Sequence, residues 1–384
     1  MLHWEHGIVT ERRDGWQGVA RLQVRIEGAD GQDESHGSRG AAEIVPALAY
    51  PELTGEPAVG ERVLLNTNAL RRELGTGGEA LVVARPDAPS RTASLSGHMV
   101  KARYTPMQTM VDAIDDPASE HYATLQAAES LEGMPVVVAD LHSSLPAIVA
   151  GVRADAPEAR IAYIHTDAAA LPAAYSATAA ALRRAGMLTA TISAGQSFGG
   201  DLEAVTVHSA LLGARHVVGA DVAVAIQGPG NLGTGTGWGF SGVQAAEALH
   251  AAHVLGGAPV AALRVSGADP RQRHRGLSHH SATILGRATL VPVRIPVPGQ
   301  DHETLDSAFH LSVREQLQSD VITPSIARGA PHRLIDVPLE GLREALESVP
   351  VRLSTMGRGL EEDPWSFLYA ALAGRCAAGL LTAE

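Results

Sequence analysis

Residues 220–242 read ADVAVAIQGPGNLGTGTGWGFSG, and this stretch decides the fold. Val222, Val224 and Ile226, with alanines between them, form a continuous apolar run that is typical of a strand buried on both faces of a parallel sheet. Glycine then recurs at almost every second position, so the backbone can take positive φ and lie close to another molecule. A helix is predicted to begin at Ser241. The stretch therefore predicts a strand, a loop that presents N–H groups, and a helix whose positive end suits an anion, above all a phosphate.

This loop supplies most of the anion-binding residues that we predict. They are Gly230, Asn231, Gly233, Thr234, Gly235, Thr236 and Gly237. With Ala220 and Asp221 before it, the loop resembles the phosphate-binding segment of the tubulin and FtsZ-type GTPases, in which an Ala-Asp strand precedes a glycine-threonine loop and a helix. The resemblance implies a phosphate or nucleotide ligand, although the other nucleotide-binding signatures of those GTPases are missing. The alternative is a turn in which glycine serves packing alone.

The composition argues against several classes of protein. The 384-residue chain is 45% hydrophobic and 19% charged, as in ordinary soluble proteins of two or three domains. Its formal net charge of −12 argues against nucleic-acid and membrane-surface partners, because both need a basic face. Cys376 is the only cysteine, which excludes an internal disulfide. The start of the chain has no apolar signal core, and Arg375 interrupts the apolar stretch 365–381, so we expect a cytoplasmic protein with a packed C-terminal helix and leave a homodimer open.

The order of the patterns predicts a small β domain followed by an α/β domain. In residues 1–95, Leu22, Val24 and Ile26 alternate with polar residues, and 61–68 and 80–85 are further strands. Residues 96–134 are predicted to be a connector with a helix at 118–131. From residue 135 to 384 strands and helices alternate, which predicts a doubly wound, mainly parallel sheet covered by helices. The strands that we predict there are 135–140, 160–165, 188–193, 221–226, 259–265 and 290–296, with another at 350–355 after a helix at 339–348.

The polar loops follow the carboxyl ends of these strands, whereas the connections that enter the strands are short and plain. In open α/β sheets ligands bind outside the carboxyl ends of the strands. We therefore predict one crevice there, with Asn231 and Arg273 beside the candidate catalytic residues. The candidate catalytic residues are Asp140, His142, His165, Asp167, Ser197 and Asp201.

Residues 195–199, GQSFG, fit the G-x-S-x-G pattern and lie between a predicted strand and a helix. This local pattern resembles the nucleophile elbow of the α/β-hydrolases. The resemblance implies that Ser197 attacks the substrate and that Asp269 with His279 or His280 completes a triad. The alternative is a sharp turn permitted by glycine, with Ser197 or Asp201 capping the helix.

Two further groups of residues suggest ligand binding. Asp140, His142, His165 and Asp167 follow two strands, and their oxygen and imidazole ligands would suit a divalent metal ion; structural or acid–base histidines are the alternative. Arg271, Arg273 and His274 lie together in a later loop, where arginine could bind a phosphate or carboxylate. The alternative there is a solvated turn in which Asp269 pairs with an arginine.

The succession of motifs HTDAAALP, GQSFGGDLEAV and ADPRQRHRGLSHH resembles an actinobacterial family of uncharacterised proteins, known as a domain of unknown function. The resemblance implies no activity. Our hypothesis is an enzyme that binds a phosphorylated or nucleotide-like small molecule, with the reaction and any cofactor left open. The alternatives are a serine hydrolase that uses Ser197 and a non-catalytic nucleotide-binding or regulatory protein.

Overall fold

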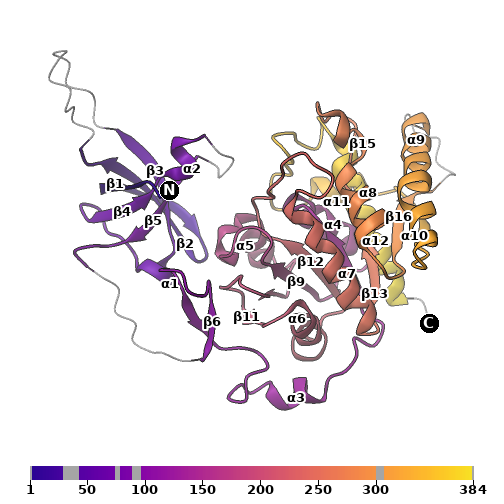
Figure 1. Ribbon diagram of the computed structural model, residues 1–384, viewed down its shortest axis with the longest axis horizontal. Coiled ribbons are helices and arrows are strands. Elements are labelled where there is room, and N and C mark those ends of the chain that lie inside the picture. The colour runs from indigo at the N-terminus through magenta and orange to yellow at the C-terminus, as the bar shows by residue number, and fades with distance from the viewer. Residues whose placement is uncertain (1, 29–42, 74–77, 89–96, 300–306, 383–384) are drawn as a thin grey trace. The chain divides into compact units, whose positions relative to one another are not determined.

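The computed structural model describes residues 2–28, 43–73, 78–88, 97–299 and 307–382, and the chain forms two compact units (Figure 1). The first unit contains Met1–Ser96 with Tyr104–Thr109, and the second contains Gly97–Arg103 with Met110–Glu384. Residues 97–103 and 110–134 therefore belong to the larger unit. Each unit has its own hydrophobic core.

The first unit is a closed barrel with the strand order β1-β2-β3-β5-β4. Leu22, Val24 and Ile26 point into its core, as their alternation with polar residues predicts. The predicted strands 61–68 and 80–85 correspond to β4 and β5. The elements of this unit are β1 (Trp4–Trp16), β2 (Val19–Ile26), β3 (Ile44–Ala49), α1 (Pro51–Thr54), β4 (Arg62–Asn66), α2 (Asn68–Arg71) and β5 (Ala80–Ala84).

Between the barrel and the large sheet the chain forms a short strand pair and a short helix. The pair is β6 (Met99–Lys101) and β7 (Thr109–Val111), and the helix α3 is only Tyr122–Ala127. The predicted helix at 118–131 is therefore too long. Asp116 accepts a hydrogen bond from the N–H of Ala118, and Ser119 accepts one from His121, so local turns replace its first residues.

The second unit is built on an eight-stranded parallel sheet with the order β11-β10-β9-β12-β8-β13-β16-β17 (Figure 1). Its strands are β8 (Pro135–Ala139), β9 (Ile161–Thr166), β10 (Ala190–Ser193), β11 (Leu202–Glu203), β12 (Val222–Gln227), β13 (Ala258–Ala261), β16 (Arg294–Pro298) and β17 (Arg333–Val337). The α/β class and the predicted parallel sheet are confirmed. All six residues of β12 are buried, as expected for a central strand covered on both faces.

Two strand predictions need correction. Residues 350–355 form no strand, and the last strand of the sheet is β17, which precedes the helix α11 (Leu342–Glu347) instead of following it. As an edge strand with mostly half-exposed side chains, β17 lacks the continuous apolar run of a central strand. The predicted strand 259–265 is also divided, because β13 ends at Ala261 and β14 (Val265–Ser266) pairs with β15 (Gly276–Leu277).

Six helices of the second unit form two contacting groups. α4 (Leu145–Asp155) contacts α5 (Ala177–Arg184), α11 and α12 (Pro364–Thr382), whereas α6 (Val207–Gly213) contacts α7 (Ala245–Val254). The remaining helices are α8 (His279–Thr283), α9 (Ser307–Leu317) and α10 (Thr323–Ala327). Of the described helices, none is both long and apolar enough to cross a membrane, and α12 is a core helix, as the sequence predicts.

The strand order creates two places where the connections of neighbouring strands diverge. The chain leaves β8 and β9 toward one edge of the sheet and leaves β12 and β13 toward the other, so right-handed crossovers put their helices on opposite faces. The diverging neighbours are β9 with β12 and β8 with β13. In a doubly wound fold a ligand binds at the carboxyl ends of such strands.

Candidate functional site

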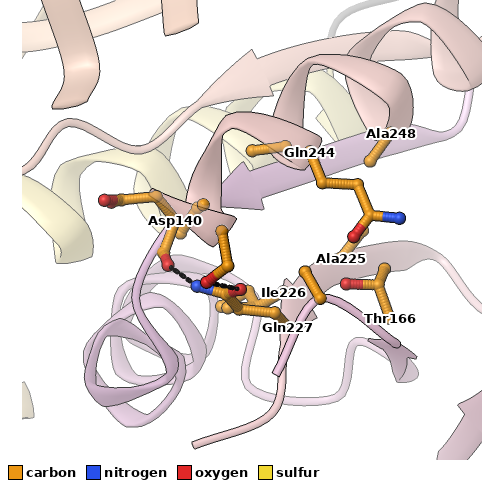
Figure 2. A pocket seen from close by; sticks show the side chains of 12 residues that line it. Asp140, Thr166, Ala225, Ile226, Gln227, Gln244 and Ala248 are labelled. Atoms are coloured by element: carbon orange, nitrogen blue, oxygen red, sulfur yellow. Dashed lines mark hydrogen bonds between the residues drawn. The ribbon is translucent and has the colours of Figure 1, made fainter. Parts of the chain in front are cut away.

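The carboxyl ends of β8 and β12 are tied together by side chains. Gln227 donates from Nε2 to the backbone oxygen of Asp140 at 2.6 Å and accepts at Oε1 from the Ser241 hydroxyl at 3.0 Å (Figure 2). These groups, with Thr166 and Gln244, line a cavity of about 10 Å³, which is room for one water molecule. The cavity between these strand ends, the floor of the predicted crevice, is therefore small, and a ligand larger than water would have to bind outside it.

Three histidines converge beside this floor. His274 ends the 3-10 turn η5 (Gln272–His274), and His279 and His280 begin α8. One ring nitrogen from each lies within 4.8 Å of the others. The cluster forms because β14 and β15 pair antiparallel, which folds the 267–275 loop back over the start of α8.

Asp140 contacts one histidine of this cluster. Its carboxylate is buried, with Oδ2 at 3.0 Å from His280 Nδ1 and 3.8 Å from the guanidinium of Arg264. Arg264 also lies 3.0 Å from the same His280 nitrogen, which cannot both donate and accept. Donation from His280 to the carboxylate leaves Arg264 as the counter-charge of Asp140. Burial opposes ionisation of Asp140, but the hydrogen bond from His280 and the charge of Arg264 outweigh it and hold the pKa below its usual value.

Two of the three histidines have lowered pKa values. Burial, together with nearby arginines and the other histidines, lowers the pKa of His274 to about 3 and that of His279 to about 4. Nδ1 of His274 lies 2.7 Å from the Ser278 hydroxyl, while Nε2 of His279 is buried and has no hydrogen-bond partner among the described residues. A neutral imidazole has a nitrogen lone pair that can accept a proton or bind a metal ion.

The glycine loop covers the same region. Phe240, at its end, stacks on His280 with ring centroids 3.8 Å apart and planes 6° apart. A β-carbon at Gly235, which has φ of +87°, would lie 3.7 Å from the guanidinium of Arg273. A β-carbon at Gly237 would lie 4.0 Å from that of Arg287. The loop therefore brings two arginines and the histidine cluster into one neighbourhood.

Part of the loop is closed by its own side chains. The N–H of Thr234 bonds to the oxygen of Gly239 at 2.7 Å, and the N–H of Gly239 bonds to the Thr236 hydroxyl at 3.1 Å. The two threonine hydroxyls lie 3.2 Å apart. Asn231 is also engaged, since it accepts from Ser241. The hydroxyls of Thr234 and Thr236, which we predicted to bind a ligand, thus maintain the shape of the loop. The N–H groups of Gly235, Thr236 and Gly237 are among those of the loop that have no acceptor in the described structure.

Residues 46–374, which contain the whole of this site and every strand of the large sheet, match a protein family of unknown function, DUF3866. The chain belongs to the DUF3866 family. Neither the curated proteins nor the solved structures give a significant match to it.

In this DUF3866 protein Arg271 is a structural residue, contrary to its prediction as an anion ligand. Its guanidinium is held by Asp269 at 3.0 and 2.8 Å, and Arg358 binds the same carboxylate at 3.2 Å. Arg358 also binds Asp363, which accepts a hydrogen bond from Ser266. This network fixes the loop that carries Arg273 and His274.

Ser197 does not have the geometry of a nucleophile. Its side chain is fully buried, and the hydroxyl lies 2.8 Å from the oxygen of His165 and 2.9 Å from that of Ala194. Asp269 is committed to Arg271 and Arg358, as described above, so the triad is not assembled. The glycines of GQSFG permit a sharp turn, as the alternative predicts: Gly195 has φ of +69°, and a β-carbon there would lie 2.2 Å from the Asp167 carboxylate. The cap of the following helix α6 is Thr206, however, and not Ser197 or Asp201.

Asp140, His142, His165 and Asp167 do not converge as metal ligands within the described part of the chain. His142 contacts the Ser176 hydroxyl at 2.7 Å and the Tyr163 hydroxyl at 3.3 Å. His165 is fully buried, and neither ring nitrogen has a hydrogen bond of ordinary geometry. Asp167 accepts from the N–H of Gln196 and from Gln244, and it lines a cavity of about 120 Å³ that adjoins the smaller one and shares Thr166 and Gln244 with it.

Asp201 lies outside the predicted crevice. Its carboxylate accepts from the N–H of Thr191 at 2.7 Å and from Arg183 at 3.1 Å. Thr191 stands in the first half of β10, so Asp201 is displaced from the carboxyl end of that strand. The residues that sequence reasoning missed are Arg264, Gln227 and Arg287. Arg264 and Gln227 could have been found by the same strand-end rule, whereas no motif marks Arg287.

The native state of this protein should be less stable at mildly acidic pH. Burial lowers the pKa of His142 to about 4 and that of His165 to about 3, whereas both are about 6.5 in an unfolded chain. Below pH 6.5 the unfolded chain therefore binds protons that the native state does not. The free energy of unfolding should fall by up to about 1.4 kcal/mol per pH unit for each histidine between pH 6 and pH 4.

Urea unfolding at pH 7.5, 6 and 5 measures this dependence. In His142→Asn the free energy of unfolding should fall less steeply as the pH is lowered, by the equivalent of about one bound proton. The reason is that the variant lacks one histidine that is neutral in the native state. His253→Asn, which changes an exposed histidine at the end of α7, is the matched control. Equal slopes in the wild type and His142→Asn would contradict the assignment.

Proposed function

We propose that this DUF3866 protein is an enzyme that acts on a small molecule carrying a phosphate or another anionic group. The anion binds to the N–H groups of Gly235, Thr236 and Gly237 and to the guanidinium of Arg273. The three histidines and Asp140 lie next to that site and supply the groups for proton transfer or metal binding. The single observation that carries the proposal is the position of Arg273 over Gly235, beside the histidine cluster.

The backbone supports an anion at this place. The N–H groups of Gly235, Thr236 and Gly237 follow one another, are exposed, and have no acceptor among the described residues. Successive free N–H groups in a loop with positive φ form a concave set of donors that binds anions in many proteins. A β-carbon at Gly235 would only touch the Arg273 guanidinium, at 3.7 Å, so the φ of +87° is what favours glycine there.

The charges support it as well. Arg264 and Arg271 each have a carboxylate partner, but Arg273 and Arg287 have none among the described residues. Both are exposed on a protein with a net charge of −12. An unpaired arginine is free to bind a phosphate or carboxylate through two parallel hydrogen bonds.

A thermal-shift screen of inorganic phosphate, sugar phosphates, nucleotides and organic acids at low salt tests the proposal. A ligand that binds only the native state raises the melting temperature. We expect at least one phosphorylated compound to do so and Arg273→Ala to weaken its binding at least about tenfold, the loss of about 1.4 kcal/mol that one charge-assisted hydrogen bond provides. The matched control is Arg184→Ala, another exposed arginine in the same unit.

A shift that is equal in the wild type and Arg273→Ala would reject this site. Turnover of the bound compound separates an enzyme from the alternative, a non-catalytic nucleotide-binding or regulatory protein. In that alternative the nucleotide binds tightly, depends on Arg273, and is recovered unchanged after long incubation.

A further inference from the structure

We propose that His274, His279 and His280 together bind a divalent metal ion, with Zn²⁺ as the best match to the ligand set. This goes beyond the anion site of the proposed function, and it can hold even if that site fails. This candidate metal site also differs from the one that the sequence suggested at the strand ends.

The first argument is the convergence of the three rings. Their ligand nitrogens lie within 4.8 Å of one another. No other group of three or more histidine, cysteine or acidic residues is this close among the described residues. Zn²⁺ binds imidazole nitrogen at about 2.0–2.1 Å, which places neighbouring ligands of a tetrahedral ion roughly 3.4 Å apart. A small inward rotation of the rings would therefore complete the site. His279 sits on α8 between Ser278, the N-cap of that helix, and His280, so the backbone of two of the ligands is already fixed.

The second argument is the way the rings are oriented. Nδ1 of His280 is held by Asp140 and Nδ1 of His274 by Ser278, which leaves Nε2 of both rings for a ligand. Histidines that bind metal ions almost always donate their other N–H to a carboxylate or another oxygen in this manner. Nε2 of His279 is buried without a hydrogen-bond partner in the described structure. An unpaired polar atom in such a position is costly unless a ligand satisfies it.

The third argument concerns charge. The arginines around the cluster would repel a cation, but Asp140 faces Arg264 and Asp269 faces Arg271, so two of these charges are balanced. Arg273, one of the two arginines there without a carboxylate partner in the described structure, would face the anionic group of a substrate.

Three histidine ligands leave one coordination position open. Structural zinc sites are closed by four protein ligands, whereas catalytic sites have three and keep a position for water or a substrate oxygen. This cluster therefore has the ligand number of a catalytic site, and its neighbour, the glycine loop, has the groups to hold an anionic substrate. The chain has one cysteine, Cys376, which is buried in α12 far along the chain and adds no ligand to the group.

The test is a titration of the metal-stripped full-length protein with Co²⁺ and Zn²⁺. We expect one equivalent of Zn²⁺ to be retained after desalting. Co²⁺ should give the intense visible absorption of a tetrahedral complex, and Zn²⁺ should displace it. His279→Gln should abolish both, His253→Gln should change neither, and Asp140→Asn should weaken the affinity about 10–100-fold because it removes the carboxylate that orients His280.

A pale octahedral Co²⁺ spectrum of the wild type, or Zn²⁺ retention that survives His279→Gln, would overturn the inference. The wild-type spectrum decides the matter even if a variant fails to fold. Phosphate-dependent thermal shifts of the metal-stripped protein, with and without Arg273→Ala, are measured in parallel. Metal binding without an Arg273-dependent shift would reject the proposed function alone, and the reverse result would reject the metal site alone.

Discussion

Gly374→Ala is expected to destabilise the protein by about 3 kcal/mol or more, although alanine is the better helix former. A β-carbon at Gly374, in α12, would lie 2.0 Å from the backbone oxygen of Ile148 and 2.8 Å from the nitrogen of Val152. Both atoms belong to the backbone of α4, so no side-chain rotation can relieve the contact. Gly151 has the same relation to Ala371, at 2.0 Å, so the two helices cross through a pair of glycines.

Gly379→Ala is the matched control, because it makes the same change in the same helix. No atom lies within 4 Å of a β-carbon at Gly379, so this variant should be neutral or up to about 1 kcal/mol more stable. Urea unfolding of the three proteins gives the comparison. Equal stability of Gly374→Ala and Gly379→Ala would show that α4 and α12 do not pack at this distance. Since α4 follows β8 and Asp140, the crossing also bears on the site.

Lys101→Ala should cost about 3–5 kcal/mol, because it leaves a buried carboxylate without its counter-charge. Lys101 is fully buried, and its Nζ donates to the backbone oxygens of Ser193, Ser197 and Ala204. The carboxylate of Glu203 lies 2.8 Å from it. Burial lowers the pKa of Lys101 and raises that of Glu203, so each depends on the other to stay charged.

Two variants complete this test. Arg103→Ala removes an exposed basic residue two positions away and should change the free energy of unfolding by less than about 0.5 kcal/mol. Lys101→Met with Glu203→Gln removes both charges while keeping an acceptor for the N–H groups of Gly199 and Gly200, and it should recover most of the loss. If the double variant is as unstable as Lys101→Ala, the pair is not the cause.

The sequence predicts the central sheet well because burial on both faces leaves a plain signal. The apolar runs of β8, β9 and β12 are continuous, and the polar residues that follow them mark one end of the sheet. β17 was missed because an edge strand with half-exposed side chains lacks that signal. The barrel strand at Leu22, Val24 and Ile26 gives a different signal: its apolar residues alternate with polar ones, and this period matches the pleat of a strand with one buried face.

The site was harder to predict, because its residues owe their roles to contacts that no local pattern encodes. Ser197 fits a catalytic motif, yet its hydroxyl is buried against the oxygen of His165, more than thirty positions earlier in the chain. Arg271 and Arg273 are alike in sequence, but only Arg271 reaches Asp269. His274 meets His279 and His280 because β14 pairs with β15, a register that composition and periodicity do not reveal.

The most direct measurement of the anion site is an anomalous difference map from crystals of the full-length protein soaked in tungstate, a tetrahedral dianion like phosphate. We predict a peak within hydrogen-bonding distance of the N–H groups of Gly235, Thr236 and Gly237 and of the Arg273 guanidinium, and its loss in crystals of Arg273→Ala. Tungstate peaks that lie only elsewhere on the protein, with this loop empty, would contradict the account.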